Sequence, residues 1–193
     1  MTDIHRLPIP FGPFILLERA GAGGMGVVWR GRHQASGLEV AIKTLRADAQ
    51  PRATEQTSRA LFDASLDREV RAIAALNHAR VVRVLDHGRT SAEDTILGGD
   101  LPWLAMTWMP GGPLKASSVT DWGSVRSTVK DVLEGLAWAH AHGVLHRDIK
   151  PSNVLGSGDG RWALADFGIA RLPQGADPLS GWGSPEFMAP EQR

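Results

Sequence analysis

A short run of structure-breaking residues, Pro110-Gly111-Gly112-Pro113, limits most strongly how this chain can fold. Proline lacks the backbone N–H that helices and sheets use, and adjacent glycines favour neither structure. Before this run, short apolar and β-branched segments alternate with turn residues, as in strands. After it, the clearest pattern is a long amphipathic helix. We therefore expect a β-rich first part and a mainly helical second part, joined by a flexible segment.

The first part is predicted to contain strands and one helix. The expected strands are Phe14–Glu18, Val27–Arg32, Glu39–Leu45, Val81–Leu85 and Trp103–Trp108. The helix is predicted over Leu61–Leu76, where apolar side chains recur at helical spacing. Glu69 falls on this apolar stripe. A carboxylate buried there needs a partner, because an unpaired buried charge is costly.

The second part is predicted to begin with a long helix whose apolar stripe faces the core. The members of this stripe are Val125, Val129, Val132, Leu136 and His140. Gly143 is expected just past the end of the helix, where glycine is favoured because it adopts positive φ angles. Short strands are expected around Val154-Leu155 and at Trp162–Ala165, on either side of a glycine-rich turn.

Composition excludes several classes of protein. Hydrophobic residues make up 42% and charged residues 22%, which argues against disorder, collagen-like repeats and coiled coils. The 21 Lys and Arg residues balance the 21 Asp and Glu residues, so no charge excess favours nucleic acid or an anionic membrane as a partner. The absence of cysteine fits a reducing compartment. No signal peptide or membrane span is predicted, and the expected location is cytoplasmic.

A glycine-rich run, Gly21-Ala22-Gly23-Gly24-Met25-Gly26-Val27-Val28, has the G-x-G-x-x-G spacing that lets backbone N–H groups approach phosphate. A dinucleotide-binding fingerprint has the same spacing, with Glu39 near the place of its ribose-binding acid, but that fold needs a helix to begin at the glycines. The valines and the Ser36-Gly37 turn instead favour a β-hairpin. A mononucleotide P-loop is excluded because no Gly-Lys-Ser/Thr follows. A turn-rich hairpin without a ligand remains an alternative for this motif alone.

A second signal is Val40-Ala41-Ile42-Lys43, in which a lysine lies near the end of an apolar strand. Such a lysine can simply extend into water. However, Glu69 needs a partner, and Lys43 is the nearest candidate that could also contact phosphate. The two residues together indicate an ion pair beside an anion site.

Three further motifs follow in order: His146-Arg147-Asp148-Ile149-Lys150-Pro151-Ser152-Asn153, Asp166-Phe167-Gly168 and Ala189-Pro190-Glu191. With the earlier signals, this series resembles the eukaryotic-type protein kinases, and most closely their bacterial serine/threonine branch, from about Phe14 to Arg193. The resemblance implies an α+β, protein-kinase-like fold of two lobes: a β-rich N-lobe with one major helix and an incomplete, mainly helical C-lobe. It implies an N-terminal extension at 1–13, the N-lobe at 14–109 and the partial C-lobe at 110–193.

The resemblance implies ATP and Mg²⁺ as cofactors and gives each matched residue a role. The glycine-rich loop would cover the phosphates with Ala20, Gly21, Ala22, Gly23, Gly24, Met25, Gly26, Val27 and Val28. Lys43 would hold the α- and β-phosphates while Glu69 orients it. Asp148 would accept the proton of the substrate hydroxyl, or orient that hydroxyl, and Lys150 would steady the γ-phosphate.

The resemblance also implies a metal site and an adenine site. Asn153 and Asp166 would hold Mg²⁺. Met106 matches the gatekeeper position, and the backbone of Thr107 and Met109 would hydrogen-bond the adenine edge. The side chains expected on the two sides of the adenine ring are Val28, Ala41 and Leu155. Ordinary core packing is the alternative for Met106 and these apolar residues.

The resemblance also implies which amino acids are phosphorylated and how the enzyme is regulated. Lys150, two residues after Asp148, matches kinases that phosphorylate serine or threonine of protein substrates. Arg147 marks family members that are controlled by a phosphorylated activation segment. In that segment we expect Ser180 to be regulatory and Ser184 to position the substrate.

Two departures from the family pattern leave the function open. The connection between Lys43 and Glu69 is longer than usual, so Asp48–Ser58 is interpreted as an insertion. The sequence stops at Arg193, where the resemblance implies further helices, which predicts instability, or a partner or missing segment that completes the C-lobe. The chain is thus predicted to be part of an active serine/threonine kinase capable of autophosphorylation. The alternative is a truncated ATP-binding or interaction module with little transferase activity.

Overall fold

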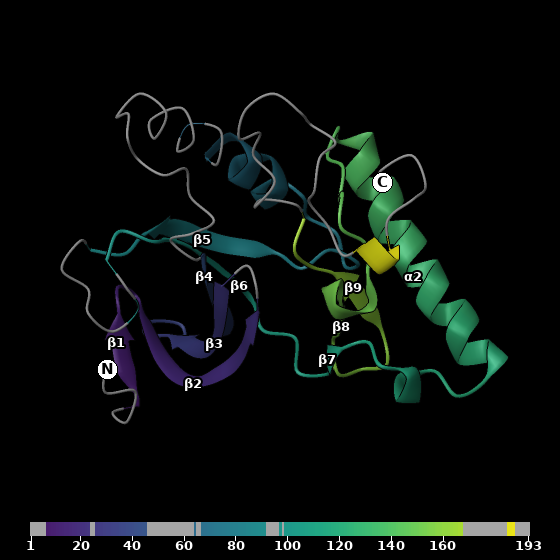
Figure 1. Ribbon diagram of the computed structural model, residues 1–193, viewed down its shortest axis with the longest axis horizontal. Coiled ribbons are helices and arrows are strands. Elements are labelled where there is room, and N and C mark those ends of the chain that lie inside the picture. The colour runs from purple at the N-terminus through teal and green to yellow at the C-terminus, as the bar shows by residue number, and fades with distance from the viewer. Residues whose placement is uncertain are drawn as a thin grey trace. The chain divides into compact units, whose positions relative to one another are not determined.

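The computed structural model describes residues 7–23, 26–45, 64, 67–91, 97, 99–167 and 185–187 (Figure 1). The chain divides into two compact units. Unit 1 comprises Met1–Arg59 and Val84–Trp108, and unit 2 comprises Ala60–Arg83 and Met109–Arg193. Several predicted features lie outside the described residues: Gly24, Met25, Asp48–Ser58, Gly168, Ser180, Ser184 and Ala189-Pro190-Glu191.

Unit 1 is built on an antiparallel sheet whose described strands lie in the order β1-β2-β3-β4-β6-β5 (Figure 1). The strands are β1 (Ile9–Phe11), β2 (Phe14–Gly23), β3 (Gly26–His33), β4 (Glu39–Leu45), β5 (Val84–Arg89) and β6 (Pro102–Thr107). The glycine-rich run joins β2 to β3 as a hairpin, in which Gly23 is paired with Gly26. Because the chain continues from the glycines as a strand and not as a helix, the dinucleotide-binding alternative is wrong.

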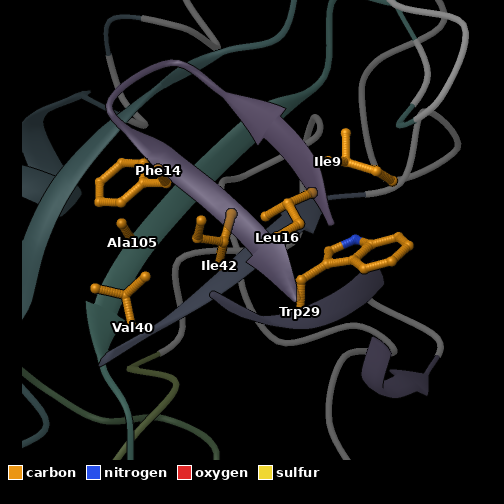
Figure 2. Close-up of a cluster of buried hydrophobic side chains, with 7 residues drawn as sticks. All are labelled: Ile9, Phe14, Leu16, Trp29, Val40, Ile42 and Ala105. Carbon is orange, nitrogen blue, oxygen red and sulfur yellow. The ribbon is translucent and has the colours of Figure 1, made fainter. Parts of the chain in front are cut away.

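A hydrophobic core lies on one face of this sheet (Figure 2). Its members are Ile9, Phe14, Leu16, Trp29, Val40, Ile42 and Ala105. Leu16 and Ile42 are 0% exposed, and burial of each aliphatic side chain of this kind contributes about 1.5–3 kcal/mol. Side chains alternate between the two faces of a strand, so the neighbours of the core residues point to the opposite face. That face carries Val28, Ala41 and Lys43.

The described part of unit 2 combines a small sheet with helices. Residues 67–74 form a helix within the predicted range, and α2 (Trp122–Ala141) is the long predicted helix. The sheet has the order β7 (Gly112–Pro113), β8 (Val154–Gly156), β9 (Trp162–Leu164). Short 3-10 turns occur at η2 (Ala116–Ser118), η3 (Pro151–Asn153) and η4 (Pro185–Phe187). None of the described helices is long and apolar enough to cross a membrane.

The two ends of α2 are set by local hydrogen bonds. At its start, the Asp121 carboxylate accepts a hydrogen bond from the Ser124 N–H (2.8 Å), and the Ser124 hydroxyl accepts one from the Asp121 N–H (3.2 Å). This reciprocal pair satisfies backbone donors that a helix leaves without partners. At its end, Gly143 has a φ of 72° and follows the capping residue His142. The predicted end of the helix is therefore confirmed.

One predicted strand begins later than expected. The sequence predicted a strand over Val81–Leu85, but β5 begins at Val84. Val81 forms a bridge with Leu164 of β9, and the Val82 N–H donates to the Leu164 carbonyl at 2.8 Å. Both valines are buried in unit 2. A run of β-branched residues does not show that two of them form backbone contacts with a different sheet.

The face of α2 that lies against β9 also differs from the prediction. Its buried residues are Thr128, Asp131, Gly135 and Ala139. By contrast, Val129 is 51% exposed and His140 is exposed, so both were wrongly assigned to the core. The reason is close approach, because a Cβ on Gly135 would lie 2.5 Å from the Arg80 carbonyl oxygen. Only small or specifically paired side chains fit at that distance.

Candidate functional site

The residues expected to contact a nucleotide in unit 1 share one face of its sheet. Val28 of β3 is paired with Lys43 of β4, and Ala41 of β4 is paired with Met106 of β6. Ala41 and Lys43 are 7% and 8% exposed, respectively. This face therefore presents two small apolar side chains, a methionine and a buried lysine, which suits a flat apolar ring joined to an anionic group.

The glycine-rich loop offers accessible backbone at the end of the β2–β3 hairpin. Ala20, Gly21, Ala22 and Gly23 are exposed residues of β2, and Val27 follows Gly26 on β3. A Cβ on Gly21 or Gly23 would meet no atom within 4 Å. Gly26 has a φ of 146°, which side chains rarely allow. The loop can therefore bring backbone N–H groups close to phosphate oxygens.

The last residue of β6 and the segment that follows it contain the two backbone groups expected at the adenine edge. Thr107 ends β6, where it is paired with Val40. The Met109 carbonyl accepts a hydrogen bond from the Gly112 N–H at 3.1 Å. The Met109 N–H has no acceptor among the described residues. A backbone donor at this position can serve the acceptor nitrogens of a purine.

Asp148 in unit 2 is held by two neighbouring residues. Its side chain is buried, at 7% exposed. Its Oδ2 atom lies 2.9 Å from Lys150 Nζ and accepts a hydrogen bond from Asn153 Nδ2 at 3.2 Å. The same Asn153 amide donates to the Asp148 carbonyl at 2.8 Å. The η3 turn, with Pro151 in its first turn, brings Lys150 and Asn153 back toward Asp148, so one carboxylate oxygen has a fixed direction.

His146 links this loop to the segment that precedes Asp166. It is 1% exposed, its Nε2–H donates to the Ala165 carbonyl at 2.9 Å, and its Nδ1 accepts from the Asp148 N–H at 3.3 Å. Burial lowers the pKa of His146, and although the Ala165 carbonyl and the charges of Asp148 and Asp166 act the other way, the net pKa is below the usual value. The imidazole is therefore neutral at neutral pH, which keeps Nδ1 available as an acceptor.

Asn153 and Asp166, the residues expected to bind a metal ion, lie on adjacent segments. The Ala165 N–H donates to the Asn153 carbonyl at 2.9 Å, which places the residue before Asp166 beside Asn153. Asp166 has a φ of 57°, a left-handed conformation that is unusual outside glycine and is common at functional sites. Because the Asn153 amide nitrogen is engaged by Asp148, its side-chain oxygen points elsewhere. A carboxylate and an amide oxygen are the ligands that Mg²⁺ prefers.

Glu69 is paired with Arg147 in unit 2. Arg147 Nη1 lies 3.4 Å from Glu69 Oε1. Burial raises the pKa of Glu69, and the Arg147 charge lowers it only in part, so the net pKa is above its usual value. The sequence required a partner for this carboxylate, and Arg147 is one. The predicted Lys43–Glu69 pair joins residues of different units and stays a prediction.

An ion cluster around Asp131 was missed by the sequence analysis. Asp131 of α2 is 1% exposed and lies 2.9 Å from Arg161 Nη2 and 3.1 Å from Arg80 Nε. It also accepts the Trp162 N–H at 2.9 Å. Burial raises its pKa, but the hydrogen bonds from Arg161 and Trp162 and the charges of both arginines bring the net pKa below the usual value. The sequence signal that could have shown its burial is helical spacing with the small residues Thr128, Gly135 and Ala139.

This cluster fixes the start of β9, the strand that leads to Asp166. β9 is in turn paired with β8, where Leu155 faces Ala163 on one side and Pro113 on the other. Unit 2 therefore holds a buried carboxylate and a lysine on the loop before β8, and the strands β8 and β9 place Asp166 on the neighbouring segment. This is the arrangement expected of a phosphoryl-transfer enzyme.

Comparison with known proteins agrees with this class. The model of the family described as "Protein kinase domain" matches residues 14–192, and the chain belongs to the protein kinase family. It is 35% identical over 193 residues to serine/threonine-protein kinase Pkn1 of Myxococcus xanthus, covering 94% of this chain and 25% of that protein. It is 38% identical over 196 residues to serine/threonine-protein kinase AfsK of Streptomyces coelicolor, covering 96% of this chain and 22% of that protein. The chain thus spans about a quarter of the length of these curated relatives.

The family assignment confirms the predicted fold class. The described sheet of unit 1 is the expected β-rich lobe, and α2 is the main described helix of unit 2. The bacterial sources of both relatives agree with the predicted branch of the family.

Proposed function

We propose that this chain transfers the γ-phosphoryl group of ATP to serine or threonine hydroxyls of proteins, including its own. The observation that carries the proposal is the geometry at Asp148, whose Oδ2 lies 2.9 Å from Lys150 Nζ and is bonded to the Asn153 amide. A buried carboxylate held in this way is suited to orient a substrate hydroxyl and accept its proton. The two relatives are both named serine/threonine-protein kinases, which supports the acceptor class.

Unit 1 is proposed to bind the nucleotide through the sheet face described above. Val28 and Ala41 contact one side of the adenine ring, and Leu155 of unit 2 is assigned to the other side. The backbone of Thr107 and Met109 bonds the adenine edge beside Met106. Lys43 binds the α- and β-phosphates, with Glu69 as its orienting acid, and the glycine-rich loop covers the phosphates.

The proposed reaction uses residues of unit 2. The substrate hydroxyl oxygen forms a bond to the γ-phosphorus while the bond from that phosphorus to the bridging β–γ oxygen breaks, and ADP leaves with the electron pair. Asp148 orients the hydroxyl and receives its proton, and Lys150 contacts the transferred group. Asn153 and Asp166 hold Mg²⁺, which when bound neutralises negative charge on the phosphates.

The remaining parts of the proposal concern location and partners. The chain is proposed to act on protein substrates, as its protein kinase domain implies, and to do so in the cytoplasm. Arg147 is proposed to receive a phosphorylated activation segment, which would withdraw it from Glu69. The two contacts of Arg147 then compete, so phosphorylation would free Glu69 for Lys43.

The test separates a kinase from a nucleotide-binding module. The full chain is incubated with Mg²⁺, γ-labelled ATP and a generic protein acceptor, and its thermal stability is measured with and without ATP. We expect label on serine or threonine, lost in Asp148→Asn and kept in the control Asp86→Asn, which changes an exposed aspartate of β5. Stabilisation by ATP without any transfer would overturn the proposal and identify a binding module.

A further inference from the structure

A charged cluster continues the nucleotide-binding face of unit 1 along the same strands. Arg30 is two residues beyond Val28 on β3 and is paired with Ala41. Glu39 is two residues before Ala41 on β4. In Figure 2 the intervening residues Trp29 and Val40 belong to the core on the other face. By alternation, Arg30 and Glu39 point to the face that is proposed to bind ATP.

Arg30 is held by two acids from the neighbouring strands. Its Nη1 donates to Glu18 Oε1 of β2 at 3.0 Å, and its Nη2 donates to Glu39 Oε1 of β4. The hydrogen bonds that Arg30 donates to Glu39 and to Glu18 raise the pKa of Arg30 further, so it stays charged. Two acids on opposite sides leave the planar guanidinium little freedom to rotate.

The guanidinium so fixed lies over an aromatic ring. Arg30 Cζ is 5.5 Å from the centroid of the Trp108 ring, within the range of a cation–π contact. The Trp108 N–H also donates to the Glu39 carbonyl at 3.4 Å. Trp108 is therefore attached to β3 through its ring and to β4 through its backbone.

Trp108 lies where this attachment can affect adenine binding. Trp108 is the residue between Thr107 and Met109, the two residues whose backbone is proposed to bond adenine. A side chain fixed at the middle residue restricts the φ and ψ angles on either side of it. The segment is then ordered before the nucleotide arrives, which lowers the entropy lost on binding.

We propose that Arg30 is a positioning residue for adenine recognition: it holds Trp108 against the sheet and thereby orders the backbone that contacts the base. This inference rests on the proposed function, because it assumes that ATP binds to this face. Arg30 thereby contributes to affinity and selectivity for the base and makes no contribution to binding of the phosphates.

The test measures binding and not transfer. Dissociation constants for ATP, GTP and inorganic tripolyphosphate are obtained by displacing a fluorescent ATP analogue from the full chain in Mg²⁺. Arg30→Met and Trp108→Ala are each expected to weaken ATP binding about three- to tenfold, the range of a partly exposed cation–π contact. The preference for ATP over GTP, measured as the ratio of their affinities, should fall by the same factor. Tripolyphosphate binding should not change.

Further variants make the result specific. Trp108→Phe keeps a ring under Arg30 and should bind ATP within about twofold of the wild type. The double variant Arg30→Met with Trp108→Ala should bind ATP no more weakly than either single variant, because the two substitutions remove the same contact. Arg32→Met removes another arginine from the same face of β3, at an exposed position, and should change nothing.

Each outcome decides something. If the wild-type chain binds ATP but Arg30→Met leaves the affinity and the ATP/GTP ratio unchanged, the inference alone is wrong. Equal losses of ATP and tripolyphosphate binding would mean general damage to unit 1 and would also overturn it. If the wild type binds neither compound, the proposed function fails and the inference fails with it.

Discussion

Replacing Gly135 with alanine tests how closely α2 packs against β9, the strand that leads to Asp166. The added Cβ would lie 2.5 Å from the Arg80 carbonyl oxygen and 3.1 Å from Leu164 Cδ1. The same carbonyl accepts the Leu164 N–H at 2.9 Å, a bond that ties β9 to the chain after residues 67–74. The methyl group therefore displaces backbone and not a flexible side chain.

The expected magnitude follows from opposing effects. Alanine favours a helix interior over glycine by about 0.5–1 kcal/mol. Overpacking against backbone costs about 1–3 kcal/mol, and losing the Leu164 hydrogen bond costs about 1 kcal/mol more. We expect Gly135→Ala to lower the free energy of unfolding by about 1–3 kcal/mol in urea denaturation.

A matched control isolates helix propensity. Ser127→Ala changes an exposed position of the same helix and should be neutral or stabilise the chain by a few tenths of a kcal/mol. If Gly135→Ala were as stable as the wild type or more stable, the close approach of α2 to Arg80 and β9 would be incorrect.

Two more substitutions test the polar groups that hold the site. Asp131→Ala leaves Arg80 and Arg161 without their buried acid and should cost about 2–4 kcal/mol in the same urea assay. Lys130→Gln removes only the exposed ion pair of Lys130 with Glu134 and should cost less than about 0.5 kcal/mol. A cost of Asp131→Ala as small as that of Lys130→Gln would contradict the Asp131 cluster. For His146, the pKa in the folded chain is below the ordinary histidine value of about 6.5, so the unfolded chain binds more protons and stability falls as the pH drops below about 6.5. His146→Gln should flatten this part of the stability–pH curve, and an unchanged slope would show that His146 is not buried in its neutral form.

Much of the fold could be predicted because local rules and tertiary structure agree. The valines after the glycine-rich loop favour a strand, and β3 begins at Gly26. Gly143 ends α2 because its φ of 72° suits glycine. In both cases the residue type limits the backbone directly, so no knowledge of distant contacts is needed.

The incorrect predictions concern residues whose structure is set by contacts with distant parts of the chain. Val81 and Val82 look like the start of β5, but Leu164 of β9 takes their backbone hydrogen bonds. Hydrophobicity placed Val129 in the core, whereas the close approach at Gly135 excludes large side chains from the buried face. No pattern in one helix reports how near its neighbour lies.

In the candidate site, too, some residues could be predicted from the sequence and others could not. The motif residues could be found from sequence because their order is specific, but the partners that hold them could not. Arg147 as a partner of Glu69, and Arg30 as the neighbour of Trp108, each join segments far apart in the chain. Charge and spacing alone do not distinguish such a pair from a solvated surface residue.

The central proposal is that Asp148 is the fixed carboxylate that orients the substrate hydroxyl and accepts its proton. The most direct measurement is the single-turnover rate of label transfer from γ-labelled ATP to protein serine or threonine, for the wild type and for Asp148→Asn, at saturating ATP and Mg²⁺. We predict a rate about 10²–10⁴-fold lower in the variant, with ATP affinity unchanged, because positioned acid–base groups contribute that much. Equal rates in the two proteins would contradict the account.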